Sequence, residues 1–235
     1  MIHRLKSLVL ALATPLVLWG CVLTPGKFVS TLDIRADRSF AFSYVGEVYA
    51  VDMGKELGKG LNDGADAAED AATLKPASLQ GDGATDDSEA KNRAIAEALA
   101  KEAGYRKVEY AGGGKFLIDY AASGRLTYPF LFPFSSDAEV IFPFVMIELR
   151  GGDRVRVRAP AFGADSSKKG MTDSGSGADK LDGSFTLTTD AEIVSQNNEN
   201  GAATSATGRR VIQWRATPAT KDAPMAVLKV APLGA

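Results

Sequence analysis

The chain has 235 residues, of which 45% are hydrophobic, and its 27 basic and 29 acidic side chains give a formal net charge of −2. Its one histidine, His3, lies at the extreme N-terminus and its one cysteine is Cys21. This composition excludes a disulfide within the chain, and beyond Cys21 it excludes histidine-dependent catalysis and zinc sites of the His/Cys type. The near balance of charge offers no basic patch for a phosphate backbone, so we expect no nucleic-acid partner.

The first 20 residues have the parts of a secretion signal. Arg4 and Lys6 form a short basic region, and residues 8–18 form an almost wholly apolar run. That run is shorter than the roughly 20 apolar residues that a membrane-spanning helix needs. We therefore predict that residues 1–20 are a signal peptide that is removed.

The apolar run ends in Leu18-Trp19-Gly20-Cys21, which resembles the lipobox of bacterial lipoproteins. The shared features are a leucine three residues before the cysteine and a small residue immediately before it. The resemblance implies that Cys21 receives a diacylglyceryl group, that cleavage follows Gly20, and that the new amino group is acylated with a fatty acid such as palmitate. The alternative is an ordinary secreted protein that is cleaved elsewhere and carries a chance free cysteine.

A lipid on Cys21 would decide where the chain is located. Two or three acyl chains hold a protein stably on a bilayer. Residues 21–26 form a short tether before the first expected strand, and its five residues after Cys21 span at most roughly 18 Å, so the domain should lie close to the membrane of the cell envelope. By analogy with lipoproteins of bacteria that have two membranes, Val22 in place of aspartate favours the outer membrane, facing the periplasm.

Beyond the signal, the chain is long enough to bury a sizeable core. Without Arg4 and Lys6 it has 25 basic and 29 acidic side chains, a net charge of −4. We expect a single domain over residues 27–232. Two stretches rich in small and polar residues, at about 54–87 and 164–182, are predicted to be flexible inserts.

Alternating apolar and polar residues predict β-hairpins. Residues 28–34 and 40–48 alternate on either side of a short polar turn at 36–38, and further turns are expected at Gly112–Gly114 and at Gly151–Gly152. In all we expect about nine strands: 28–34, 40–48, 108–110, 116–120, 138–149, 154–158, 184–195, 210–217 and 224–230.

One clear helix interrupts the strands. Ser88 is a suitable N-cap, Ile95 and Leu99 lie on one apolar stripe, and Gly104 is a typical residue for the end of a helix. One helix among many hairpin-forming strands predicts an α+β fold with a mainly antiparallel sheet.

The last third of the chain carries a second resemblance. Val211-Ile212-Gln213-Trp214 and the trailing Pro218, within the strand–loop–strand run of residues 183–230, look like part of the LppM-type lipoprotein domain of bacterial envelopes. Together with the lipobox and the first hairpin, the similarity extends over most of the chain beyond the signal. It implies an α+β envelope domain for which lipid binding has been proposed, and it implies no catalytic residue. Trp214 itself is expected to be a core residue.

The most unusual segment is rich in aromatic residues and proline. It runs from residue 128 to 134, and a second such run at 141–146 follows. Its candidate contact residues for an apolar ligand or a bilayer are Tyr128, Phe130, Phe132, Phe134, Phe142 and Phe144. Proline removes a backbone donor, so the first run is a poor central strand. Either these aromatics cap the core of the sheet, or they line a pocket for acyl chains or enter the adjacent bilayer.

No motif for catalysis, a metal or a cofactor emerges. The nearest acids for glycan hydrolysis are unpaired in the sequence: Asp119, Asp137, Glu139 and Glu148. The acids at positions 82, 86 and 87 miss the spacing of a calcium loop. We therefore expect no metal, no cofactor and no enzymatic activity.

Three functions are left open by the sequence. The first, which we favour, is a non-enzymatic module that binds lipid or another apolar molecule of the envelope. The second is an assembly lipoprotein whose inserts or sheet edges bind an envelope protein. The third, a hydrolase that uses carboxylates, is the least supported.

Overall fold

The computed structural model of the chain describes residues 21–52, 83–135, 140, 142–163 and 178–234. The predicted signal peptide at 1–20 and most of the two expected inserts lie outside the described residues. No helix in the described part is long and apolar enough to cross a bilayer.

The first hairpin is present as predicted and is longer than expected. Strand β1 (Cys21–Ile34) pairs antiparallel with β2 (Ser39–Asp52), from Cys21 opposite Asp52 to Ile34 opposite Phe40. Residues 21–26, which the sequence suggested as a tether, are the first part of β1. Strand pairing continues there because the segment is apolar, and Leu23 is already buried.

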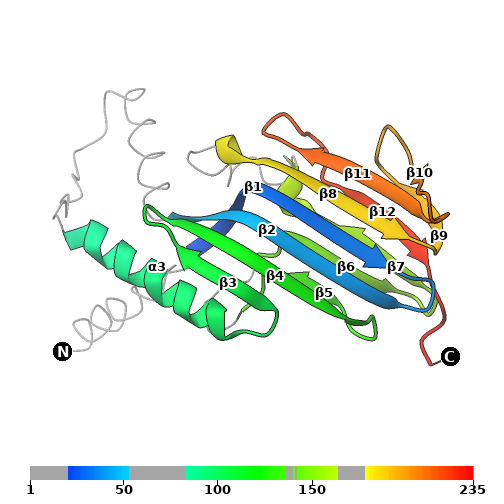
Figure 1. Ribbon diagram of the computed structural model, residues 1–235, viewed down its shortest axis with the longest axis horizontal. Coiled ribbons are helices and arrows are strands. Elements are labelled where there is room, and N and C mark those ends of the chain that lie inside the picture. Colours follow the sequence, from blue (N-terminus) through cyan, green and yellow to red (C-terminus); the bar gives the residue numbers. More distant parts are fainter. Residues whose placement is uncertain (1–20, 53–82, 136–139, 141, 164–177, 235) are drawn as a thin grey trace, which may run out of the picture.

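The strands form two sheets (Figure 1), which we call the large sheet and the small sheet. The large sheet has the order β10-β11-β8-β1-β2-β4-β3, and the small sheet has the order β5-β6-β7-β12-β9. The remaining strands are β3 (Tyr105–Tyr110), β4 (Lys115–Arg125), β5 (Phe130–Phe132), β6 (Val145–Arg150), β7 (Arg154–Arg158), β8 (Asp182–Thr189), β9 (Glu192–Gln196), β10 (Ala203–Thr204), β11 (Arg210–Ala216) and β12 (Met225–Lys229). Short 3-10 helices η2 (Pro160–Phe162) and η4 (Ala178–Lys180) lie between β7 and β8.

The prediction of an α+β fold with mainly antiparallel strands agrees with this architecture, but the described residues alone contain twelve strands, against the expected number of about nine. Strands β5 and β10 are too short to give a periodic signal. The expected strand at 184–195 is two strands, because the chain leaves the large sheet after Thr189 and enters the small sheet at Glu192. One pairing, β1 with β8, is parallel.

The helix also differs from its prediction. Helix α3 (Gly83–Lys101) begins five residues before Ser88, so Ser88 is inside the helix and is not its N-cap. At the other end, Gly104 follows with φ +95°, as expected of a residue that ends a helix.

The core lies between the inner faces of the two sheets, with Ile95 and Leu99 of α3 joining it. Each strand of the first hairpin was predicted to alternate between two faces, and the apolar residues of that alternation, such as Leu32 in β1 and Phe42 in β2, are buried there. Aromatic rings fill much of this space, and Phe28 stacks on Phe162 at 4.3 Å between ring centroids. Trp214 is a core residue, as predicted, and is only 7% exposed.

The long strands of the large sheet give the molecule two ends. At one end β1 begins at Cys21 beside the last residue of β2. At the other end, the β1–β2 turn holds Arg38, which is fully buried and has φ 75°. At about 3.3 Å per residue, the 14 residues of β1 separate the Cys21 end from the Arg38 end by roughly 43 Å.

Candidate functional site

The six aromatic residues singled out from the sequence separate into a buried set and an exposed set. Phe132 and Phe144 are each 1% exposed, and Phe130 is half-buried against the core. Phe134 and Phe142 are 51% and 44% exposed, and Tyr128 is 80% exposed. Phe130, Phe132 and Phe144 therefore cap the core, as one of the two interpretations predicted. The other three aromatic residues present a surface to a ligand or a bilayer.

Phe132 is the centre of an aromatic cluster that joins the two sheets. Its ring centroid lies 5.1 Å from those of Phe42 and Tyr44 and 4.5 Å from that of Tyr120. These three rings come from β2 and β4 of the large sheet, whereas Phe132 comes from edge strand β5 of the small sheet. The proline-flanked run thus enters a sheet only at its edge, where a missing backbone donor is tolerated.

The exposed Phe134 and Phe142 lie on one hairpin that continues the β5–β6 pair. Strand β5 passes from Phe130, beside Phe40, to Phe132, beside Tyr44, and so runs toward the Cys21 end. Beyond it, Ser135 and Val140 form an isolated antiparallel bridge. The two exposed phenylalanines are therefore directed to the same end of the molecule as Cys21.

Tyr128 lies at the opposite end. It follows Arg125, which pairs with Ser39 at the Arg38 end, and the backbone N–H of Leu126 donates to the carbonyl of Arg38. Tyr128 and the two exposed phenylalanines therefore do not form one patch.

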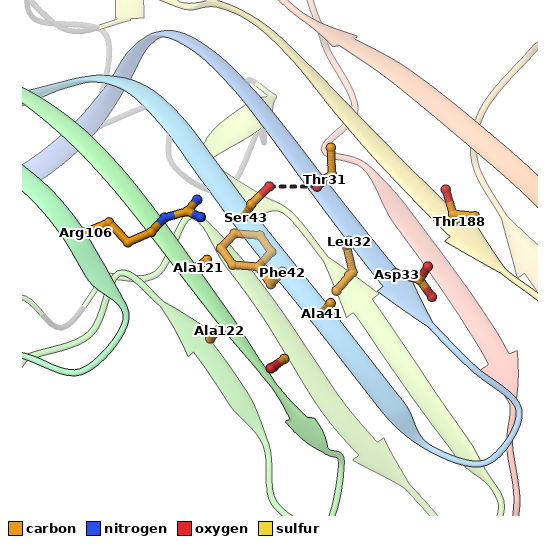
Figure 2. Close-up of a pocket in the computed structure, with 11 residues that line it drawn as sticks. Thr31, Leu32, Asp33, Ala41, Phe42, Ser43, Arg106, Ala121, Ala122 and Thr188 are labelled. Atoms are coloured by element: carbon orange, nitrogen blue, oxygen red, sulfur yellow. Dashed lines mark hydrogen bonds between the residues drawn. The ribbon is translucent and has the colours of Figure 1, made fainter.

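An open groove lies on the outer face of the large sheet (Figure 2), a feature that the sequence prediction missed. Its volume is about 570 Å³, and it is lined by Thr31, Leu32, Asp33, Ala41, Phe42, Ser43, Arg106, Ala121, Ala122, Ser123 and Thr188. The outward side chains of its floor are short, and the hydroxyls of Thr31 and Ser43 lie 2.7 Å apart in a hydrogen bond. The floor is uncharged, so it suits a flat polar or mixed surface.

Ion pairs border this groove. Arg106 contacts Asp119 at 2.7 Å, and Arg209 contacts Asp33 at 2.5 Å with both oxygens engaged. The hydrogen bond with Asp33 raises the pKa of Arg209. The border is therefore electrically neutral, and the groove offers no excess charge to attract an ionic ligand.

The carboxylates considered for hydrolysis do not converge in the described part of the chain. Asp119 belongs to β4 of the large sheet and pairs with Arg106, whereas Glu148 belongs to β6 of the small sheet and binds Arg150 and Arg156. Asp137 and Glu139 lie outside the described residues. Within the described residues, no group of three or more His, Cys, Asp or Glu side chains is placed to hold a metal ion.

No protein-family model and no curated protein matches this chain. Among solved structures, the NMR structure of the folded domain of LppM from Mycobacterium tuberculosis aligns with 94% of this chain and 98% of that chain, at 16% identity and a TM-score of 0.34. A likeness this loose carries no conclusion about fold or function.

Proposed function

We propose that this chain is an envelope lipoprotein that is acylated at Cys21, and that its domain is a non-enzymatic module that contacts lipid. The signal-like pattern of residues 1–20, which ends at the only cysteine of the chain, supports acylation. The outer leaflet of an inner membrane or the periplasmic face of an outer membrane would then be the immediate surroundings of the domain.

The start of β1 makes this anchor unusually direct. Because strand pairing begins at Cys21 itself and Leu23 is buried, the acyl groups would be attached to the end of the sheet with no free tether. The Cys21 end of the molecule would then face the bilayer. The pairing of β1 from Cys21 onward is the observation on which the proposed lipid-contacting role mainly depends.

Phe134 and Phe142 are the side chains best placed for such contact. Both are exposed, and the hairpin that holds them is directed to the Cys21 end. Exposed aromatic side chains favour the membrane interface because burying their apolar surface there is stabilising. Phe132 and Phe144 are buried in the core, so they can contribute to lipid contact only indirectly, by holding the exposed residues in place.

Replacing Phe134 and Phe142 together with serine should weaken binding of the unacylated chain, without its signal, to phospholipid vesicles by at least about tenfold. Full burial of one such side chain contributes about 1.5–3 kcal/mol, so the loss of partial burial at two positions reaches this size. The melting temperature should change little because both side chains are exposed. Vesicle co-sedimentation and a thermal melt measure the two effects.

Tyr128→Ser is the matched control, since Tyr128 is an exposed aromatic residue at the Arg38 end. It should leave vesicle binding unchanged. Equal losses in both proteins would mean that the effect comes from general surface hydrophobicity and would count against the proposed orientation.

A second candidate function is assembly with an envelope protein through the outer face of the large sheet. Val29 and Val45 are paired neighbours on β1 and β2, are 58% and 49% exposed, and lie beside the uncharged groove. An apolar centre inside a border of ion pairs is typical of a protein interface. Val45→Lys should disrupt this assembly and leave vesicle binding intact, which separates the two functions.

A further inference from the structure

The outer face of the small sheet carries a ladder of arginines. In β7 every second residue is arginine, and the residues between them, Val155 and Val157, are buried in the core. The side chains of Arg154, Arg156 and Arg158 therefore all point away from the core, at intervals of roughly 6.6 Å along the strand. Such a regular row of guanidinium groups needs an explanation in a chain with an overall negative charge.

Neighbouring strands add to this positive charge. Arg150 of β6 and Lys229 of β12 both lie opposite Arg154 in register. The acids on this face are Glu148, which binds Arg150 and Arg156, and Glu192, which lies opposite Lys229. Five basic side chains thus face two acidic ones, so the expectation from the net charge that the chain has no basic patch is wrong for this face.

Three of these cations have no carboxylate within ion-pair distance in the described part of the chain. Arg154, Arg158 and Lys229 take no part in any salt bridge there, whereas the basic residues at the edges of the groove on the large sheet are paired. The charge on the small sheet is therefore available to an external anion. Guanidinium groups suit phosphate because they can donate two parallel hydrogen bonds to it.

Apolar side chains lie in the same rows as the arginines. Met146 and Met225 are the cross-strand neighbours of Arg158, and Leu131 is the next neighbour on β5. Leu131 is 36% exposed. The same β5–β6 pair continues into the hairpin that holds Phe134. A soluble polyanion would use only the charges, whereas the interface of a bilayer would use both the charges and the apolar groups.

We propose that the outer face of the small sheet docks on anionic lipid headgroups, with Arg154, Arg158 and Lys229 as phosphate contacts. This proposal rests on the acylation of Cys21, which would bring the domain to the membrane. Docking tilts the domain so that the small sheet, not the large one, lies on the bilayer. The groove on the large sheet is then turned away from the membrane and stays accessible to a partner.

A single fluorophore on the full acylated chain tests this orientation. Cys21 is the only cysteine of the chain, and its thiol is blocked once it is acylated. One variant, Ser195→Cys, therefore carries a single label on the small sheet, and a second variant, Gln213→Cys, carries a single label on the large sheet. Both positions are exposed in strands at the matching faces. In vesicles of phosphatidylcholine with about one third phosphatidylglycerol and a brominated lipid as quencher, we expect quenching at position 195 and not at position 213.

The charges should control this docking. Each basic residue near an anionic surface contributes about a fivefold change in the docking equilibrium, so Arg154→Gln with Arg158→Gln should lower the ratio of docked to undocked molecules about 25-fold. With the arginines unchanged, raising NaCl from 50 to 500 mM should also abolish quenching at position 195, because salt screens the contacts between the basic side chains and the headgroups. The matched control, Arg106→Gln with Arg215→Gln, removes the same charge from the large sheet and should leave quenching unchanged.

Quenching at position 213 in place of 195, or equal quenching in pure phosphatidylcholine, would overturn the proposal. So would the absence of quenching at both positions. The mass of the Cys21 peptide is measured on the same sample: an acylated cysteine without quenching refutes the docking face alone, whereas an unacylated cysteine refutes the lipoprotein assignment.

Discussion

Replacing Phe132 with alanine should destabilise the domain by about 3–5 kcal/mol, the usual cost of truncating a buried phenylalanine. Phe132 is 1% exposed and contacts rings from both β2 and β4. In a domain of this size, each kcal/mol lowers the melting temperature by about 2–4 °C, so a fall of about 10 °C is expected. A thermal melt followed by circular dichroism measures it.

Phe134→Ala serves as the comparison, because it removes the same side chain two residues away at an exposed position. Its melting temperature should stay within about 2 °C of the original, as is usual for surface substitutions. Similar losses in both variants would mean that the aromatic segment caps the core throughout, and would remove Phe134 as a lipid contact.

Replacing Arg38 with methionine should be at least as damaging, with an expected loss of about 3 kcal/mol or more. The Arg38 guanidinium is fully buried and donates to three carbonyls, of Ala231 at 2.5 Å, Leu126 at 3.1 Å and Gly152 at 2.7 Å. These carbonyls belong to the C-terminal segment, the chain after β4 and the β6–β7 turn. A hydrogen bond to a charged group contributes about 1.5–3 kcal/mol, so the loss of all three reaches at least this size.

Urea denaturation of three variants tests the role of Arg38. Arg38→Lys keeps the charge but cannot reach all three carbonyls, so it should also lose most of the stability. Arg35→Met, which alters an exposed arginine of the same turn, should have little effect. Full stability in Arg38→Lys would show that charge alone is needed and that the three hydrogen bonds contribute little.

Local features of the fold were predictable from the sequence. The alternation of Phe40, Phe42 and Tyr44 correctly predicted which face of β2 is directed to the core, because the pattern within a single strand is enough to assign each side chain to a face. The short strands were missed for the same reason, since β10 has two residues and no period to detect. The parallel pairing of β1 with β8 depends on contacts about 150 residues apart, which no local pattern contains.

In the candidate sites too, local patterns were predictable and features that depend on long-range contacts were not. The aromatic run was visible in the sequence, but the separation of buried Phe132 from exposed Phe134 depends on where the edge strand ends. The groove was not visible, since its floor comes from four strands whose outward residues are individually unremarkable. The sequence prediction also missed the arginine ladder, although the alternation of Arg154, Arg156 and Arg158 with valine was a detectable signal.

The most direct test of the lipoprotein assignment is the distribution of the Cys21→Ala protein between membrane and soluble fractions of its native cells. The original chain should be processed and found in the membrane fraction. The variant lacks the only cysteine of the chain, and with it the acylation site that we propose. We therefore expect most of the variant to leave the membrane fraction, or to remain uncleaved with its signal attached. Quantitative recovery of a processed variant in the membrane fraction would contradict the assignment.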